Sequence, residues 1–213
     1  MCQYHSALRP TTWGDGQPVL TADQLGYGQG MRKGSLVNGV GTVMRKIEVA
    51  LKWEPSPLGE PAAHLDIVTA TYLAADPYGS PSYLVQADSR SPDGTIYLSR
   101  YSRDGKGLGW DEVMMLELDR LDSRYARVVV GIVIHQRDGR RTFAGVRSRG
   151  LRLREGYTIL AEDDFSGVLE STAATVGEFI RADSGAWTFH PGIHGYDTEP
   201  AAFTRIMGRP HES

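Results

Sequence analysis

The run of residues 126–135 constrains the fold of this chain more than any other segment. It reads Ala-Arg-Val-Val-Val-Gly-Ile-Val-Ile-His and is the most apolar and most β-branched stretch of the sequence. β-Branched side chains favour the extended backbone, and a strand that is apolar at nearly every position is typical of burial on both faces. We therefore predict that residues 126–135 form the central strand of a sheet.

Short β-rich runs precede and follow this strand, and a turn signal closes each of them. In residues 42–53, apolar side chains alternate with charged ones, so one face points inward and the other toward solvent. Asp138-Gly139 is a hairpin signal that predicts another strand at 142–146. Residues 119–124 suit either a short helix or a turn. Frequent strands with few helical intervals predict an all-β fold, a β-sandwich with strands at 42–53, 65–73, 83–87, 96–101, 113–118, 126–135, 142–146, around Leu151 and Leu153, and at 157–160.

Charge and cysteine content exclude several classes of protein. The chain has 23 basic and 26 acidic residues, a net charge of −3, which gives no global field that would attract nucleic acid or an anionic membrane. Cys2 is the only cysteine, so no intrachain disulfide can form, as is usual in a reducing cytoplasm. The sequence has neither the apolar core of a secretion signal nor the roughly 18 apolar residues of a spanning helix. We expect a cytoplasmic protein without a nucleic-acid partner and without direct membrane insertion.

The chain divides into an arm, one domain and a short tail. Residues 1–30 are rich in glycine, proline and polar residues and lack sustained periodicity, which predicts an irregular N-terminal arm. After residue 31 there is neither an obvious internal repeat nor a linker of the kind that separates domains. We therefore predict a single β-sandwich domain over 31–205, followed by a C-terminal tail at 206–213.

A loop rich in glycine and aspartate at 102–112 is the first candidate site. It reads Ser-Arg-Asp-Gly-Lys-Gly-Leu-Gly-Trp-Asp-Glu and leads directly into a predicted strand. Such spacing suits a loop that wraps its backbone and carboxylates around a hard cation, but calcium needs several oxygen ligands. Leu108 and Trp110 stand where further ligands would be expected, so the loop resembles an incomplete cation site.

Histidines offer a second kind of site, because neutral imidazole is a common zinc or copper ligand. Pro191 and Gly192 separate His190 from His194 and remove the helical spacing that would align them on one face. The alternative for His64 is that it replaces an acidic ligand and bonds to a neighbouring carboxylate. The chain has no Gly-x-Ser-x-Gly elbow and no Walker phosphate loop. The histidines weighed as transition-metal ligands are His64, His135, His190 and His194.

Seven arginines are concentrated after the central strand. They form either a solvated sheet face balanced by acids or a surface for anions or an acidic partner. Trp110, within the glycine loop, either plugs a former cation cavity or presents an exposed contact to another protein. The arginines are Arg137, Arg140, Arg141, Arg147, Arg149, Arg152 and Arg154.

Taken in order, several motifs resemble those of the TerD family of tellurite-resistance and stress-associated proteins. The resemblance covers about Met31 to Phe203 and implies two packed antiparallel sheets, few short helices, and calcium bound by loop carboxylates. The motifs are Met31-Arg32-Lys33-Gly34-Ser35-Leu36, Val49-Ala50-Leu51-Lys52-Trp53, His64-Leu65-Asp66 at the family's Asp-Leu-Asp position, Ser91-Pro92-Asp93-Gly94-Thr95-Ile96, Gly177-Glu178-Phe179-Ile180-Arg181, and the run from Gly185 to Tyr196.

The resemblance implies a reduced set of calcium ligands. Asp66, Asp111 and Glu112 match acidic family positions, and Asp104, which is not a family match, lies in the same loop. Because losing several anionic ligands removes most of the charge compensation, we expect weak calcium binding or none. The residues that replace family ligands are His64, Tyr101, Ser102, Leu108 and Trp110.

Three functions compete at this point. The leading hypothesis is a non-enzymatic binding or scaffold protein, associated with other proteins of a bacterial tellurite-resistance or stress-response system. The second is a working calcium sensor with Asp66, Asp104, Asp111 and Glu112 as ligands. The third is a hydrolase or metal-dependent enzyme, which predicts that His64, Asp66, Asp111 and Glu112 converge in one cleft.

Overall fold

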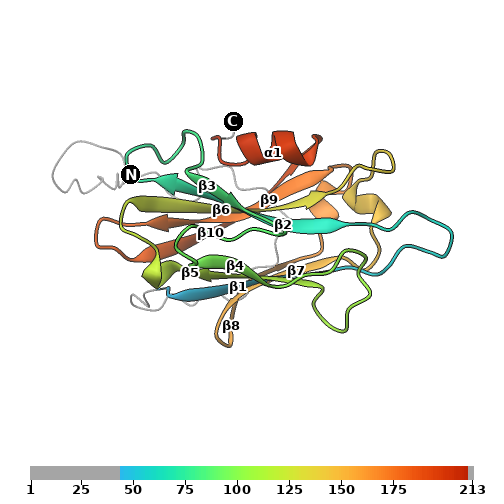
Figure 1. Cartoon of the computed structure of the whole chain (residues 1–213), viewed down its shortest axis with the longest axis horizontal. Helices are drawn as coiled ribbons and strands as arrows, with labels where there is room; N and C mark the ends of the chain where they lie inside the picture. The colour runs from blue at the N-terminus through green and yellow to red at the C-terminus, as the bar shows by residue number, and fades with distance from the viewer. Residues whose placement is uncertain (1–43, 211–213) are drawn as a thin grey trace, which may run out of the picture.

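The computed structural model describes residues 44–210, which form two five-stranded antiparallel sheets packed face to face (Figure 1). This confirms the predicted all-β sandwich. One sheet has the order β4-β5-β1-β7-β8 and the other has the order β10-β9-β6-β2-β3. The strands are β1 (Lys46–Lys52), β2 (Leu65–Leu73), β3 (Tyr83–Val85), β4 (Ile96–Arg100), β5 (Glu112–Glu117), β6 (Tyr125–Ile134), β7 (Gly150–Glu155), β8 (Thr158–Asp163), β9 (Ala173–Arg181) and β10 (Trp187–Tyr196).

The predicted central strand is the middle strand of its sheet. β6 pairs with β2 on one side and with β9 on the other, and nearly every residue of β6 is buried. Val128, Val130 and Ile132 point into the core between the sheets, whereas Val129 and Val133 lie in a second apolar cluster. The strand therefore has no solvated face, in agreement with its unbroken apolar sequence.

A short helix covers the outer face of this sheet. Helix α1 spans Pro200–Ile206, and Figure 1 places it against the sheet that contains β6. Its Phe203 is fully buried in the second apolar cluster with Val68 and Val129. Gly131 of β6 leaves room for this ring, since a Cβ there would lie 2.7 Å from Phe203.

Strand β1 confirms the alternation predicted near the start of the domain. Ile47, Val49 and Leu51 are fully buried, whereas Lys46 and Lys52 are exposed. The strand lies between β5 and β7 at the centre of its own sheet. Its inward side chains therefore face those of β2 and β6 and form the main core.

The predicted strand at 142–146 is wrong. Phe143–Gly145 form a short 3-10 helix, and Asp138-Gly139 closes a turn after which the chain crosses to the other sheet as β7. The Gln136 side chain holds this turn by bonding to the backbone of Arg141 in both directions. Phe143 stacks on Phe165 with ring centroids 4.4 Å apart, so it is anchored in the core without strand pairing.

The segment at 119–124 contains a 3-10 turn over Leu118–Arg120 rather than a longer helix. Periodicity predicts neither strand β9 nor strand β10. In β9, Gly177 and the small alanines weaken the alternating pattern. Gly177 is required there: a Cβ would lie 2.7 Å from the Phe189 ring of β10. The close contact between β9 and β10 therefore selects glycine at this position, and the glycine interrupts the pattern by which a strand is recognised.

The four edge strands are short or irregular. β3 has three residues, and the pairing of β4 with β5 shifts register between Leu98 and Arg100. On the other edges, the β7–β8 pairing shifts beside Leu153, and the pairing of β10 shifts between Pro191 and His194. None of the edges therefore presents a long, regular row of free backbone groups.

The predicted N-terminal arm and the motif from Met31 to Leu36 lie outside the described residues. Toward the other end, Met207 is buried beside α1, and the carbonyl oxygen of Gly208 accepts a hydrogen bond from Arg127. Among residues 44–210, no helix is long and apolar enough to cross a membrane.

Candidate cation site

Two histidines meet where β2 begins and β6 ends. His64 directly precedes β2 and His135 directly follows β6, and the His135 N–H donates to the His64 carbonyl oxygen at 2.9 Å. This bond extends the β2–β6 ladder by one pair, so the two side chains lie opposite each other. The imidazole rings stack with centroids 4.1 Å apart and planes only 7° from parallel.

Asp66 lies at the Nε2 edge of both stacked imidazoles. It is two residues after His64 on an extended chain, so both side chains leave the backbone on the same side. His135 Nε2 is 2.7 Å from Asp66 Oδ2, and His64 Nε2 is 3.0 Å from Asp66 Oδ1. Burial alone would raise the pKa of Asp66, but the bonds from His135 and His64 outweigh it and lower the pKa to about 2. The carboxylate is therefore charged at neutral pH and contacts both histidines. His64, Asp66 and His135 are here called the histidine-aspartate cluster.

Tyr101 joins the cluster from the opposite sheet. It follows β4, and its hydroxyl lies 3.0 Å from His64 Nε2. Burial and the nearby charge of Asp66 raise the pKa of the Tyr101 hydroxyl, so it stays protonated at neutral pH. The cluster therefore bridges the two layers of the sandwich at the end where the loops 53–64 and 101–111 leave it (Figure 1).

Glu112 is the most deeply buried acid near the cluster. Its residue has no exposed surface, and its Oε2 accepts a hydrogen bond from the Ile67 N–H, adjacent to Asp66, at 3.1 Å. Its other oxygen, Oε1, is buried without a hydrogen-bond partner in the described structure. Burial, reinforced by the charge of Asp66, raises the pKa of Glu112 to about 9. A buried carboxyl oxygen without a hydrogen-bond partner lowers the stability of the fold, so its presence here requires an explanation.

The other two predicted ligands have structural partners. Asp111 Oδ2 accepts from the Trp53 N–H and Oδ1 accepts from the Gly107 N–H, each at 3.0 Å. Asp104 pairs with Lys106 through its Nζ at 2.7 Å and its N–H at 3.3 Å. The structure therefore brings Asp66 and Glu112 to one region, but it assigns Asp104 and Asp111 to the internal bonding of the glycine loop. His64, Asp66, Asp111 and Glu112 do not share one set of contacts.

The glycines of this loop also have a packing role. Gly105 has a φ of +68°, and a Cβ there would lie 2.7 Å from the Trp53 ring. The Trp53 indole is buried and donates to the Ala63 carbonyl oxygen at 3.0 Å. The loop therefore closes over Trp53, and its glycine content is explained without a cation.

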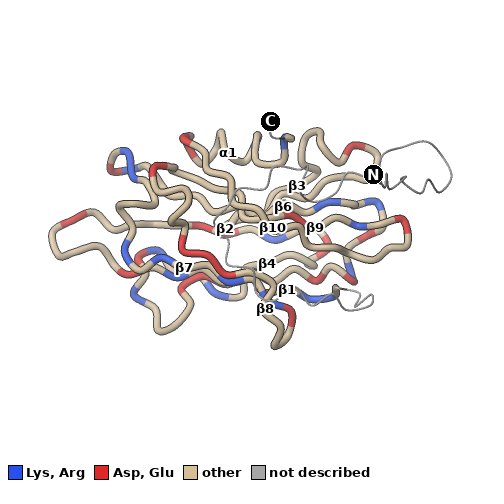
Figure 2. The backbone as a smooth tube through the Cα atoms, turned by 180° about the vertical axis from the view of Figure 1, so that it is seen from behind, with Lys and Arg blue, Asp and Glu red and all other residues tan. Residues whose placement is uncertain are grey.

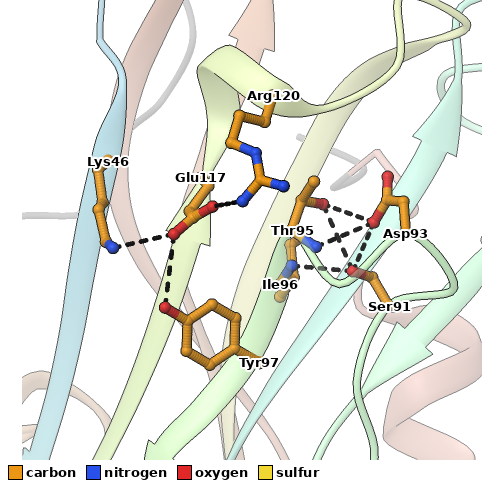
Figure 3. Close-up of polar contacts among 8 residues, drawn as sticks. All are labelled: Lys46, Ser91, Asp93, Thr95, Ile96, Tyr97, Glu117 and Arg120. Atoms are coloured by element: carbon orange, nitrogen blue, oxygen red, sulfur yellow. Dashed lines mark hydrogen bonds and ion pairs between the residues drawn. The ribbon is translucent and has the colours of Figure 1, made fainter.

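Asp93, in the motif Ser91 to Ile96, likewise completes a turn. Its Oδ1 accepts from Ser91 Oγ and Thr95 Oγ1, both at 2.7 Å, and from the Thr95 N–H at 3.1 Å (Figure 3). These bonds outweigh desolvation and lower the pKa of Asp93. Figure 3 also shows Glu117 nearby, bonded by Lys46, Tyr97 and Arg120.

Acids balance most of the predicted arginine surface. Arg154 holds Glu48 with two bonds of 2.6 Å, and Arg152 lies 3.3 Å from the same carboxylate. Arg140 pairs with Asp197 in the same way. Acidic and basic segments alternate around β7 in Figure 2, in agreement with a solvated, balanced face.

Trp110 lies on this surface and is half-buried. The guanidinium of Arg152 is 4.6 Å and the ammonium of Lys52 is 5.2 Å from its ring centroid, so the indole makes cation–π contacts with both side chains. The side chain lines a surface pocket with Lys52, Arg149 and Asp163. Its contacts are with the outer surface of β1 and β7.

His135 was weighed only as one of four scattered histidines, and sequence reasoning did not connect it with Asp66. A signal was present: His64 precedes one predicted strand, and His135 ends another. If these strands are paired antiparallel, the two histidines meet at the same end of the sheet. The pairing itself could not be read from the sequence, whereas His190 and His194 lie apart on β10.

Comparison with known proteins supports the motif-based resemblance. The TerD domain model matches residues 30–205 of this chain. The chain belongs to the TerD family. Curated relatives of this TerD-family chain include the tellurium resistance proteins TerD of an Alcaligenes species and of Serratia marcescens. They are 28% and 27% identical over 159 residues, which is 72% of this chain and 82% of each relative.

Two solved structures share the fold of this chain. The protein of unknown function SAV2460 is 71% identical, with a TM-score of 0.78 over 80% of this chain and 100% of its own. SCO6318 from Streptomyces coelicolor A3(2), a homologue of the telluride resistance protein TerD, is 49% identical, with a TM-score of 0.77. That match covers 79% of this chain and 99% of SCO6318.

Proposed function

We propose that this TerD-family chain is a non-enzymatic binding protein of a tellurium-resistance or stress-response system, in which calcium binding has been weakened or lost. In this role it acts in the cytoplasm through contacts with other proteins. Family membership supports the system, because two curated relatives carry the tellurium resistance name. The proposal on calcium rests on the chain's own residues.

The use of the loop carboxylates carries the argument against calcium. Both oxygens of Asp111 accept backbone N–H bonds, and Asp104 is paired with Lys106. Calcium requires six to eight oxygen ligands, and carboxylates already committed to N–H donors must break those bonds to coordinate it. Asp66 is flanked by two imidazoles rather than by oxygen ligands. The loop keeps its shape with internal bonds that replace the cation.

Calcium titration of the metal-free full chain tests this proposal. We expect neither calorimetric heat nor a change in melting temperature up to millimolar calcium, in the wild type or in Asp111→Ala. Asp111→Ala should lower the melting temperature itself, because the buried Trp53 N–H and the more exposed Gly107 N–H lose their partner, at a cost of roughly 1–3 kcal/mol. Asp183→Ala, at an exposed turn position, is the matched control.

The calcium-sensor alternative predicts a different outcome. At a calcium concentration a hundredfold above the dissociation constant, binding would add roughly 2.7 kcal/mol to the free energy of unfolding. A saturable rise in melting temperature that Asp111→Ala removes would therefore support the sensor. The binding role itself is tested by cross-linking in stressed cells, and a chain that remains monomeric there would contradict it.

A further inference from the structure

The histidine-aspartate cluster has the composition of a different kind of metal site. One nitrogen of His64, one nitrogen of His135 and one oxygen of Asp66 all lie within 4.8 Å of one another. Among residues 44–210, this is the one group of three histidine, cysteine or acidic side chains that gathers in this way. Two imidazoles and a carboxylate form the ligand set that zinc and iron(II) use in many proteins.

Glu112 provides an independent observation at the same place. Its side chain is fully buried, its Oε2 is bonded to the N–H beside Asp66, and its Oε1 has no hydrogen-bond partner in the described structure. Buried carboxylate oxygens without a donor are rare in folded proteins, and an absent ion is one of the usual reasons. Within the cluster itself, Asp66 Oδ1 is also buried without a hydrogen bond of good geometry, although His64 Nε2 lies 3.0 Å away, and a metal ion bound there would give it a partner.

We propose that His64, Asp66 and His135 bind a divalent first-row transition-metal ion of the zinc type. This inference does not depend on the proposed binding role. Two nitrogen ligands select against calcium, which is bound by oxygen, and favour ions of borderline softness. His64 stands at the family's Asp-Leu-Asp position, so a single substitution turns an all-oxygen pair into a nitrogen-oxygen pair. The ligand set of this cluster therefore favours a transition-metal ion over calcium.

The ligands are already held near the geometry that binding requires. Ligand atoms around a zinc ion with bonds of about 2.0–2.2 Å are roughly 3.4 Å apart, so the contacts of 2.7 and 3.0 Å between Asp66 and the histidines need to lengthen only slightly, by side-chain rotation, to admit the ion. The backbone bond between His135 and His64 fixes their separation. This preorganisation reduces the entropy lost on binding.

The ion also has a route to the site. The side chains of His64 and His135 are 15% and 21% exposed, whereas Asp66 and Glu112 lie beneath them. A ring nitrogen that coordinates a metal carries no proton. The histidines form the outer part of the site and Asp66 its base.

Zinc titration of the untagged full chain, stripped with a chelator, tests the proposal. We expect one zinc ion per chain by calorimetry and a rise in melting temperature that calcium does not produce. His135→Ala should weaken zinc binding by about 100-fold or more. Changes in residues that only surround the ligands typically cost about 10- to 100-fold. His190→Ala removes a histidine on β10 and should leave the zinc affinity unchanged.

A second variant guards against loss of folding. His64→Asp restores an all-oxygen pair and should shift preference from zinc toward calcium, measured as the ratio of the two dissociation constants. Far-UV circular dichroism of each metal-free variant confirms that the sandwich is intact. Cobalt(II) provides a spectroscopic signature, since visible bands that appear in the wild type should be lost in His135→Ala.

Two outcomes would overturn the proposal. One is the absence of stoichiometric zinc binding to the folded wild type. The other is zinc binding that His135→Ala and His64→Asp leave unchanged, because the ion would then lie elsewhere on the chain. Failure of either kind leaves the calcium result of the proposed binding role intact, so the two proposals can be judged separately.

Discussion

Asp93 illustrates at the scale of one residue how an acid in a family motif can serve the fold. Three donors from Ser91 and Thr95 converge on its Oδ1, and these bonds lower the pKa of the carboxyl. A carboxylate with a lowered pKa in the folded state contributes stability above the unfolded pKa, and that contribution is lost as the pH falls through the folded pKa. Acidification therefore weakens this turn.

Asp93→Asn tests this contribution. Because the site is partly exposed, we expect a loss of about 0.5–1 kcal/mol in the free energy of unfolding at pH 7. The difference from wild type should shrink as the pH falls below the usual range of an aspartate and through the lowered pKa of Asp93, where the wild-type carboxyl is protonated too. Urea unfolding at pH 7, 5 and 3 measures the effect, with Asp183→Asn as an exposed control. A difference that grows on acidification would contradict the assignment.

The glycine loop shows how an element can be specified by packing rather than by a ligand. Gly105 adopts a positive φ and lies against the Trp53 ring, whereas Gly109 adopts a positive φ of +84° with nothing within 4 Å of its added Cβ. The two positions share the backbone requirement and differ in the space around it. They form a matched pair for separating backbone strain from steric overlap.

We expect Gly109→Ala to cost about 1–2 kcal/mol through the left-handed backbone alone. Gly105→Ala should cost more, roughly 2–4 kcal/mol, because the new methyl group also displaces the Trp53 ring. Thermal unfolding measures both, and the near-UV circular dichroism of tryptophan should change in Gly105→Ala only. Equal costs for the two variants would show that the contact with Trp53 has no energetic weight.

At the scale of the whole molecule, Arg127 ties together elements that are far apart in sequence. From β6 it pairs with Glu178 of β9 and donates to the carbonyl oxygens of Pro77 and Gly208. Its guanidinium also lies 4.7 Å from the Tyr78 ring centroid. This one side chain joins the loop between β2 and β3, the end of α1 and the centre of the sheet.

Removing one partner of a buried ion pair leaves the other charge uncompensated. Arg127→Met should therefore reduce the free energy of unfolding by about 3 kcal/mol, at the lower end of the usual range because Glu178 is 21% exposed. Arg127→Met combined with Glu178→Gln should recover part of this loss. Urea unfolding of the four members of the cycle measures the coupling, and purely additive losses would contradict it.

The sequence predicted the architecture where side-chain patterns were strong. Residues 65–73 and 126–135 were recognised as strands because their apolar, β-branched runs reflect burial. The pattern failed at Phe143, where an aromatic anchor in a 3-10 turn has the same local composition as a strand. It failed again at β9, where contact with Phe189 selects glycine over a branched residue.

The candidate site was less predictable because it depends on pairing. The order of the motifs identified the acidic positions but did not predict their hydrogen-bond partners. Asp111 accepts from two backbone amides, and Asp66 contacts two imidazoles. His135 is 69 residues from Asp66 in sequence and joins it only through the register of β2 with β6. Such contacts between distant segments are a property of topology rather than of local composition.

The irregular outer strands have a consequence for behaviour in a crowded cell. A regular free edge can accept a strand from another molecule, and repeated addition leads to fibres. Here the register shifts along β4, β8 and β10 interrupt the row of donors and acceptors, and Pro191 of β10 has no N–H to offer. With β3 limited to three residues, both sheets end in poor templates. Among residues 44–210, we therefore expect no sheet edge to act as a regular template for strand addition.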